Sequence, residues 1–327
     1  MDLRPLGRTG LRVSALGFGC GNVGGLMVRG TPTERERAVA RALELGINYF
    51  DTAPSYGDGR SEEHLGQALR VLRADVLVGT KVRLAPTDLG AMSQAIARSM
   101  DESLRRLGLP RVDLIQFHNP IAVDRRGSWV AAKDVLDTIA PALARLVEQG
   151  KARFVGITAL GDTPALNEVI GSGAIATAQV CLNLLNPSMA EAAPTAFPAH
   201  DFGRLLSRCR ERGVGTIVIR VVAGGALSGA EERHPIASPP PEPIATAGDY
   251  TTDVRNARRL LPLVSEGFAG SLVEASLRFA AGAEGVSTVL LGYSTQEHLE
   301  YAAACIAKGP LPAEALARLR QLWTQRA

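Results

Sequence analysis

The sequence predicts an α/β fold, and within that class a (β/α)8 TIM barrel with an N-terminal β-hairpin and long loops at its C-terminal face. Short apolar, β-rich runs alternate eight times with longer amphipathic runs, as parallel strands joined by helices do. A barrel of this kind takes about 250 residues plus insertions, so we expect residues 1–327 to form one domain. The alternation does not exclude an open doubly wound sheet, and the choice depends on the motifs below.

A small hairpin is predicted before the first barrel strand. Within Arg4–Val13, the turn sequence Gly7-Arg8-Thr9-Gly10 lies between two apolar pairs, a pattern typical of a tight reversal. We expect this hairpin to close the bottom of the barrel.

Eight strands and the helices between them follow in order. The strands are predicted at Ser14–Gly19, Ile47–Asp51, Val76–Lys81, Val112–His118, Phe154–Thr158, Thr177–Leu182, Gly215–Ile219 and Val286–Gly292. Helical stretches include Glu34–Leu45, Ser61–Arg73, Met92–Leu107, Val130–Gln149 and Phe202–Arg212. Gly46, Gly108, Gly150 and Gly213 are predicted to end helices, because glycine tolerates the left-handed conformation.

Two segments interrupt this rhythm. One is Asn186–Ala199 and the other is Ala226–Val264, where the prolines at 235, 239, 240, 241 and 243 are predicted to prevent regular structure. Long loops in a compact domain act as lids or binding loops, or are disordered. The sequence leaves both interpretations open.

Composition excludes several classes of function. The 36 basic and 33 acidic residues are scattered, so nucleic acid is not an expected partner. The four cysteines are far apart and lack metal-ligand spacing, so neither a disulfide framework nor a metal site is expected.

No signal peptide is recognisable at Met1–Arg12, and every apolar stretch is interrupted well before the ~20 residues of a membrane span. We therefore expect a cytoplasmic protein, with its oligomeric state left open.

Polar residues at the ends of three consecutive predicted strands are the candidate catalytic groups. Asp51, Lys81 and His118 end these strands, and Tyr56 lies on the loop after Asp51. Active sites of barrels form where strands end and βα loops begin. Each residue alone more often serves a turn, a rim charge or core packing, but four such residues in consecutive units predict one site.

The motifs resemble those of the aldo-keto reductase superfamily over nearly the whole chain. They are LGINYFDTA at 45–53 followed by Tyr56-Gly57, SEEHLG at 61–66, LRRLG at 104–108, VDLI at 112–115 and LVEQGKARFVGI at 146–157. The resemblance implies that Tyr56 is the general acid and base. It further implies that Lys81 lowers the pKa of Tyr56, that Asp51 pairs with Lys81, and that His118 orients the substrate oxygen.

The resemblance also implies a nicotinamide cofactor, NADP or NAD. Thr158 and Gln179 take the positions that hold the nicotinamide carboxamide, whereas Ala159 replaces an amide and Ile219 replaces a stacking aromatic ring. Arg220 is either a pyrophosphate ligand or a rim charge.

The segment LLGYSTQEHLE at 290–300 resembles the motif that binds the adenosine phosphate, with Gly292, Ser294 and His298 as candidate contacts. No Lys or Arg lies between Gly292 and Glu300, so NAD competes with the NADP expected for the family. The stretch GCGNVG at 19–24 also fits a Rossmann fingerprint, but no helix is predicted at its third glycine.

The expected activity is hydride transfer that interconverts an aldehyde, ketone or aldose with an alcohol or lactone. The 226–264 insertion and residues 156–158 resemble those of sugar-oxidising members, so a small carbonyl compound or sugar is the expected substrate. Two alternatives stay open: a nucleotide-binding sensor or regulatory barrel, and a Schiff-base aldolase with Lys81 as nucleophile.

Overall fold

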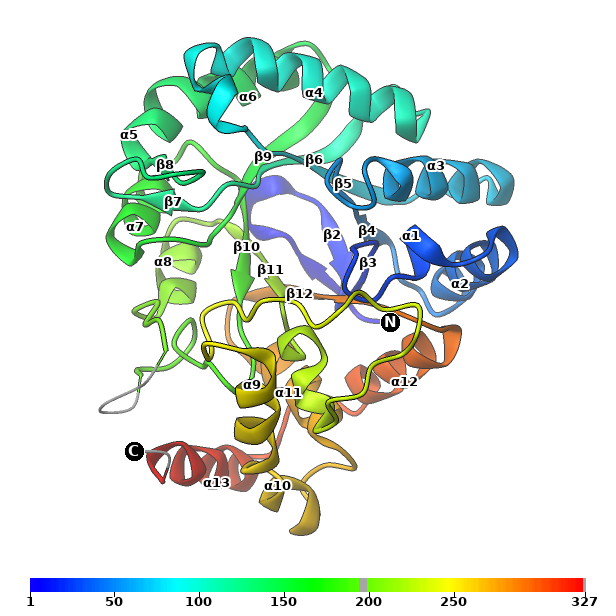
Figure 1. Ribbon diagram of the computed structural model, residues 1–327, viewed down its shortest axis with the longest axis vertical. Coiled ribbons are helices and arrows are strands. Elements are labelled where there is room, and N and C mark those ends of the chain that lie inside the picture. The colour runs from blue at the N-terminus through cyan, green and yellow to red at the C-terminus, as the bar shows by residue number, and fades with distance from the viewer. Residues whose placement is uncertain (194–198, 326–327) are drawn as a thin grey trace.

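The computed structural model describes residues 1–193 and 199–325 and contains a closed barrel of eight parallel strands. Around the barrel the strand order is β10-β11-β12-β3-β4-β5-β6-β9, and the helices form an outer ring (Figure 1). Closure of the barrel excludes the open sheet and the Rossmann interpretation of residues 19–24. The (β/α)8 prediction is confirmed.

All eight predicted strands are present. Two have the predicted bounds, and the ends of the other six shift by at most two residues. They are β3 (Leu16–Gly19), β4 (Tyr49–Asp51), β5 (Leu77–Val82), β6 (Val112–Phe117), β9 (Ala152–Thr158), β10 (Thr177–Cys181), β11 (Gly215–Ile219) and β12 (Val286–Gly292). Since all strands run the same way, their carboxyl ends meet at one rim of the barrel. This rim gathers the polar residues that follow each strand.

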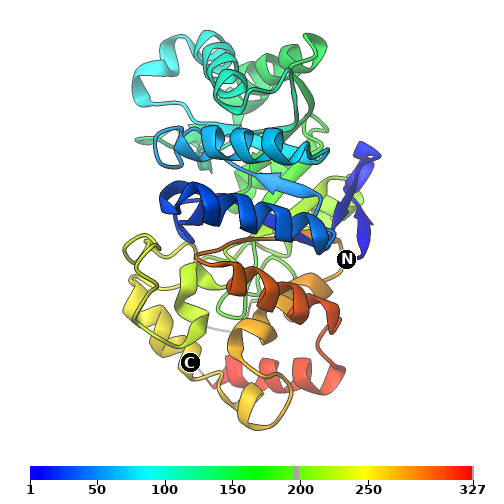
Figure 2. The same ribbon diagram turned by 90° about the vertical axis from the view of Figure 1, so that its right-hand side faces the viewer.

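The N-terminal hairpin is also confirmed. It pairs β1 (Leu3–Pro5) with β2 (Arg12–Ser14) in antiparallel fashion, with the short turn η1 (Gly7–Thr9) between them. The Arg8 amide donates to the Gly213 carbonyl, just before β11, at 2.7 Å. An apolar cluster fills the end of the barrel interior next to the hairpin. It consists of Leu6, Leu11, Val13, Tyr49, Leu114 and Ile217. Figure 2 shows the hairpin at the opposite end of the barrel from segment 223–258.

The helices cover the strands with their apolar faces. They are α1 (Leu26–Arg29), α2 (Pro32–Glu44), α3 (Arg60–Leu72), α4 (Met92–Leu107), α5 (Ala132–Asp134), α6 (Ala140–Glu148), α7 (Thr163–Gly171), α8 (Leu205–Glu211), α11 (Leu272–Gly282), α12 (Gln296–Ala307) and α13 (Ala313–Thr324). The four glycines predicted to end helices all have positive φ. Helix α2 begins two residues earlier than predicted because Thr31 and Glu34 form a capping box, with Pro32 in the first turn.

One predicted helix differs from the structure at its start. The predicted helix Val130–Gln149 begins instead with a short strand, β8 (Val130–Ala131), which pairs with β7 (Ile121–Ala122). The helix that follows contains a π-helical turn, η3 (Val135–Ile139), between α5 and α6.

The prediction that Ala226–Val264 lacks regular structure was wrong for both ends of this segment. The 3₁₀ turn η4 (Ala223–Ser228) overlaps its start, and α9 (Tyr250–Arg258) and α10 (Pro262–Ser265) lie at its end. Residues 229–249 contain no helix or strand, as predicted. The prolines at 235–243 lie before α9, and the Asp249 carboxylate caps that helix by accepting from the Thr252 amide at 2.7 Å.

The other irregular segment, Asn186–Ala199, includes residues 194–198, which lie outside the described part of the chain. Among the described residues, no helix has the length and apolar character needed to cross a bilayer.

Candidate active site

A large cavity of about 1110 Å³ opens at the carboxyl ends of the barrel strands. Its lining includes residues at or just after these ends, and residues of segment 223–258 cover it from the other side. Side chains that are distant in sequence therefore face a common space. The predicted site residues in the lining are Asp51, Tyr56, His118, Thr158, Gln179, Arg220, Gly292, Ser294 and His298.

Asp51 and Lys81 form a buried ion pair inside the barrel. They lie on adjacent strands, and the Lys81 ammonium contacts Asp51 Oδ1 and donates to the Thr52 carbonyl at 2.8 Å. Burial disfavours the charged ammonium, but Asp51 and Tyr56 together outweigh this effect, so the pKa of Lys81 lies above its ordinary value. Lys81 is therefore a fixed cation.

The second carboxylate oxygen of Asp51 accepts hydrogen bonds from neutral side chains. Tyr49 Oη donates to Asp51 Oδ2 at 2.9 Å, and Gln179 Nε2 donates to it at 2.6 Å. Gln116 Nε2 is 3.5 Å from the same oxygen. The amide of Gln179, which the resemblance assigns to the cofactor, is thus directed at Asp51, while Thr158 Oγ1 donates to Gln179 Oε1 at 3.4 Å.

Sequence reasoning missed Tyr49 and Gln116. The alternation of side chains along a strand could have indicated both residues. It places Tyr49 on the same inner face as Asp51, and Gln116 on the same face as Leu114.

Tyr56 lies next to Lys81 and His118. The Lys81 ammonium nitrogen is 4.8 Å from the centre of the Tyr56 ring, and the Tyr56 and His118 rings meet edge to face with centroids 6.2 Å apart. The structure therefore brings all four predicted catalytic residues together. Lys81 lowers the pKa of Tyr56, as the resemblance implies, but burial and the charge of Asp51 raise it by more, so the pKa lies above its ordinary value.

His118 follows β6 and is half-buried in the cavity wall. Burial and the charges of Lys81 and Arg83 lower the pKa of His118 to about 3, so its imidazole is neutral at physiological pH. Its Nδ1 atom is buried and has no hydrogen-bond partner within the described residues. This ring can donate or accept one hydrogen bond without gaining charge.

The loop between β12 and α12 closes against the loop after β3. Ser294 Oγ donates to the Gly24 carbonyl at 2.7 Å. A Cβ at Gly24 would lie 2.4 Å from the Tyr293 amide nitrogen, so only glycine allows this approach. Thr295 caps α12, and His298 lies in its first turn with its ring 6.2 Å from that of His234.

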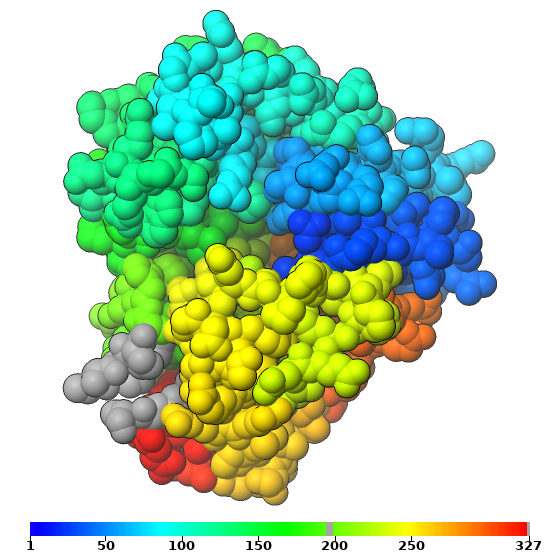
Figure 3. All heavy atoms as spheres, in the orientation of Figure 1, coloured from blue at the N-terminus to red at the C-terminus, as the bar shows by residue number. Residues whose placement is uncertain are grey.

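Arg233 anchors segment 223–258 over the cavity. Its guanidinium donates to the carbonyls of Gly224, Ser238 and Val23 at 2.5, 2.9 and 3.1 Å. Figure 3 shows the yellow-green surface of this segment against the blue surface of the N-terminal loops. Arg220 lines the same space, where Nη1 is 3.4 Å from the Glu242 carbonyl oxygen.

Comparison with known proteins identifies the family. Residues 15–324 match the sequence model of the Aldo/keto reductase family. The chain belongs to this family. It is therefore an enzyme of the dehydrogenase and reductase class, as the motifs predicted.

Named relatives of this aldo-keto reductase cover most of the chain. It is 29% identical to L-galactose dehydrogenase of Arabidopsis thaliana, over 94% of this chain and 88% of that protein. A probable voltage-gated potassium channel subunit beta of Oryza sativa subsp. japonica is 26% identical over 91% of this chain and 89% of its own length. The solved holo form of aldo-keto reductase AKR11C1 from Bacillus halodurans superposes with a TM-score of 0.73, at 26% identity, covering 98% of this chain and 96% of that one.

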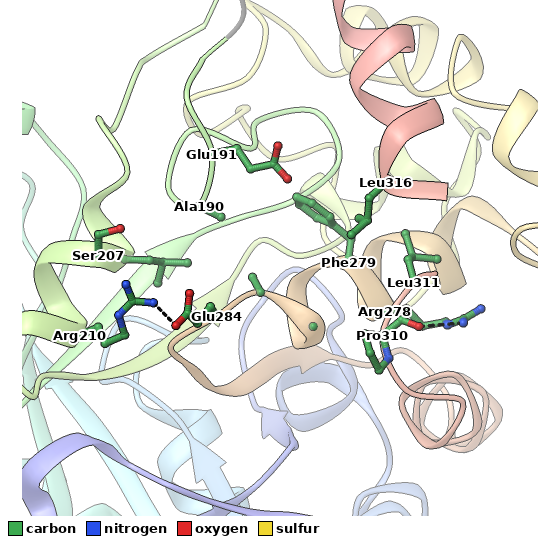
Figure 4. A pocket seen from close by; sticks show the side chains of 13 residues that line it. Ala190, Glu191, Ser207, Arg210, Arg278, Phe279, Glu284, Pro310, Leu311 and Leu316 are labelled. Carbon is green, nitrogen blue, oxygen red and sulfur yellow. Dashed lines mark hydrogen bonds and ion pairs between the residues drawn. The ribbon is translucent and has the colours of Figure 1, made fainter. Parts of the chain in front are cut away.

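A second cavity in this aldo-keto reductase shares no lining residue with the first. It has a volume of about 220 Å³ and lies among α8, α11 and the start of α13 (Figure 4). All four of its charged side chains are in ion pairs: Arg210 with Glu284, Glu191 with Arg320 and Arg278 with Glu274. The larger cavity, which contains the Tyr56 cluster, is thus the candidate active site.

Proposed function

We propose that this aldo-keto reductase transfers a hydride between a nicotinamide dinucleotide and a carbonyl carbon. The reaction interconverts an aldehyde, ketone or aldose with an alcohol or lactone, and Tyr56 is the acid and base. The observation that carries the proposal is the Lys81 ammonium, held by Asp51 and lying 4.8 Å from the Tyr56 ring at the cavity wall. The name of the relative L-galactose dehydrogenase supports a sugar as substrate.

The cavity suits a dinucleotide. Its volume of about 1110 Å³ admits a cofactor together with a small substrate, and glycines 19, 21, 24, 224, 225 and 292 expose backbone in its lining. Helix α12 begins beside this lining, and the positive end of its dipole favours an anionic group. When bound, the nicotinamide supplies or accepts the hydride. We propose that Gly292, Ser294 and His298 hold the adenosine part, with Arg220 near the pyrophosphate and Thr158 and Gln179 near the nicotinamide.

NAD is the form that the lining favours. Residues 292–302 contain no Lys or Arg, and a 2′-phosphate is commonly bound by such a cation. His298 is a poor substitute, because partial burial and the neighbouring His234 lower its pKa. Arg233 already donates to three carbonyl oxygens. We therefore expect NADH to bind more tightly than NADPH near neutral pH.

The protonation state of Tyr56 and the charge of Lys81 determine how the proton is transferred. The raised pKa keeps its phenol protonated at neutral pH, so Tyr56 can donate to the carbonyl oxygen during reduction. The phenolate that results lies beside Lys81, whose positive charge stabilises it. In the oxidative direction the same phenolate removes the alcohol proton.

His118 completes the site as a neutral donor. With a pKa of about 3 it carries no charge at neutral pH, and its ring lies beside that of Tyr56. A hydrogen bond from this imidazole to the carbonyl oxygen orients the substrate without competing for the proton that Tyr56 donates.

The test is nicotinamide absorbance with NADH and NADPH against a panel of aldehydes, ketones and aldoses. Tyr56→Phe is expected to lower kcat by about 100-fold to 10,000-fold while cofactor still quenches protein fluorescence. Tyr301→Phe is the matched control, because it also removes a tyrosine hydroxyl from the lining of this cavity, but one that contacts Ser271 at 2.7 Å and lies away from Lys81. Equal turnover by wild type and Tyr56→Phe overturns the assignment of the acid.

One outcome of that panel supports a different function. The similarity to a protein named as a channel subunit beta favours a nucleotide-binding regulatory barrel as the second candidate. Tight cofactor binding without turnover of any panel member supports that candidate instead.

A further inference from the structure

Arg83 lies one residue beyond the end of β5, next to the catalytic cluster. Side chains on a strand alternate between two faces, so Arg83 continues the face of Lys81, while Val82 between them packs in the core outside the barrel. Arg83 lines the large cavity together with Tyr56 and His118. Its guanidinium therefore belongs to the wall of the reaction space.

The strand register places Arg83 level with His118. Val82 pairs with Phe117 across β5 and β6, and the His118 amide donates to the Val82 carbonyl at 2.9 Å. The positive charge of Arg83 contributes to the lowered pKa of His118, after burial and Lys81. A substrate whose carbonyl oxygen meets His118 thus has Arg83 beside it.

The guanidinium of Arg83 is available to bind a ligand. It is exposed, and it makes no hydrogen bond or ion pair with any residue that the structure describes. The other cations of the cavity differ in this respect. Lys81 is paired with Asp51, Arg233 is anchored by carbonyls, and Arg220 lies within reach of the Glu242 carbonyl.

The acidic side chains of the cavity lining do not neutralise this region. They are Asp51, which is already paired with Lys81, and Glu232, which belongs to segment 223–258. A planar guanidinium binds carboxylates and phosphates through two parallel hydrogen bonds. We infer that Arg83 selects carbonyl substrates that carry a carboxylate or phosphate group, an inference that rests on the hydride-transfer function proposed above.

Matched substrate pairs test this inference. In each pair one aldehyde is anionic and its counterpart is neutral: 4-carboxybenzaldehyde with methyl 4-formylbenzoate, and glyceraldehyde 3-phosphate with glyceraldehyde. Wild type is expected to favour at least one anionic member in kcat/KM, and the pair that shows the preference identifies carboxylate or phosphate. Arg83→Gln is expected to lower that anionic-to-neutral ratio by about 10-fold to 100-fold, mainly through KM.

Two further variants sharpen the result. Arg83→Lys keeps the charge but not the planar donor pair, so an intermediate ratio is expected. Arg111→Gln is the matched control, because Arg111 is equally exposed but precedes β6 at the other end of the barrel. Its ratio is expected to equal that of wild type. No anionic preference in wild type, or an equal loss for both members of each pair in Arg83→Gln, overturns the inference and leaves the oxidoreductase function intact.

Direct binding separates the two proposals. If no aldehyde is turned over with either cofactor, the proposed function fails, and calorimetry with 4-carboxybenzaldehyde and glyceraldehyde 3-phosphate still tests Arg83. At least tenfold weaker binding of one of them by Arg83→Gln than by wild type supports the inference. Equal binding by both proteins overturns it.

Discussion

The two parts of the large cavity are built differently. The proposed catalytic residues Asp51, Tyr56, Lys81 and His118 lie on strand ends or on the loops that follow them, and the ion pair between Asp51 and Lys81 is buried within the barrel. The β12–α12 loop and segment 223–258 form the other part, where contacts run mostly through backbone carbonyls and one arginine.

This difference separates chemistry from specificity. Strand ends are fixed by neighbouring strands on both sides, so groups that must keep their positions during proton transfer are held there. Loops tolerate substitution, and they carry the features by which one member of a fold differs from another. Perturbing the cluster should therefore affect stability and turnover together, whereas perturbing the loops should affect binding.

The largest effect is expected when the buried pair is broken. Lys81→Met leaves the Asp51 carboxylate without its cation, so the free energy of unfolding should fall by about 3–5 kcal/mol and kcat by at least about 100-fold. The double variant Asp51→Asn, Lys81→Met removes both charges and should regain stability without regaining turnover. Urea unfolding and kcat measure the two effects. Turnover of Lys81→Met within tenfold of wild type would contradict the role of the cation.

A smaller effect is expected from His118 at acidic pH. Its pKa of about 3 in the folded protein lies below the ordinary value of 6.5, so protonation favours the unfolded chain. Its contribution to stability is fully present above pH 6.5 and is lost as the pH falls towards 3. Between pH 7 and pH 5 wild type should lose about 2 kcal/mol more than His118→Gln. Parallel urea curves for both proteins at the two pH values would contradict this prediction.

The smallest effect is expected in the loop part of the cavity. Arg233→Ala removes the guanidinium that donates to the carbonyls of Val23, Gly224 and Ser238, so the Kd for NADH should rise about tenfold, and kcat at saturating cofactor should change less. Fluorescence titration measures the Kd. Arg259→Ala is the control, because Arg259 is an exposed arginine directly after this segment. The prediction fails if the two variants bind NADH equally well.

Most of the fold could be predicted because it depends on local patterns. The eight strands, the hairpin and the four helix-ending glycines follow from apolar periodicity and turn chemistry, which are readable along the chain. Helix α9 was missed because the prolines before it dominated the composition of its segment. The capping contact between Asp249 and Thr252 gave a weaker signal.

The candidate site could be predicted only in part. Strand ends and motifs indicated the four residues of the cluster, but not which polar atoms meet inside the barrel. Tyr49 and Gln179 both donate to Asp51 Oδ2, a convergence of β4 and β10 across the barrel that no spacing along one strand reveals. The upward shift in the pKa of Tyr56 likewise depends on its burial in three dimensions.

The barrel seam between β3 and β12 joins distant parts of the sequence. Leu16 pairs with Val289 and Gly19 with Gly292, so the first barrel strand finds this neighbour only when the last one has been synthesised. Until then β3 has an unpaired edge, and contacts of such large sequence separation form slowly. A nascent chain that stops before β12 therefore has an open sheet with an edge available for aggregation. The enzyme's fold is completed late in its synthesis.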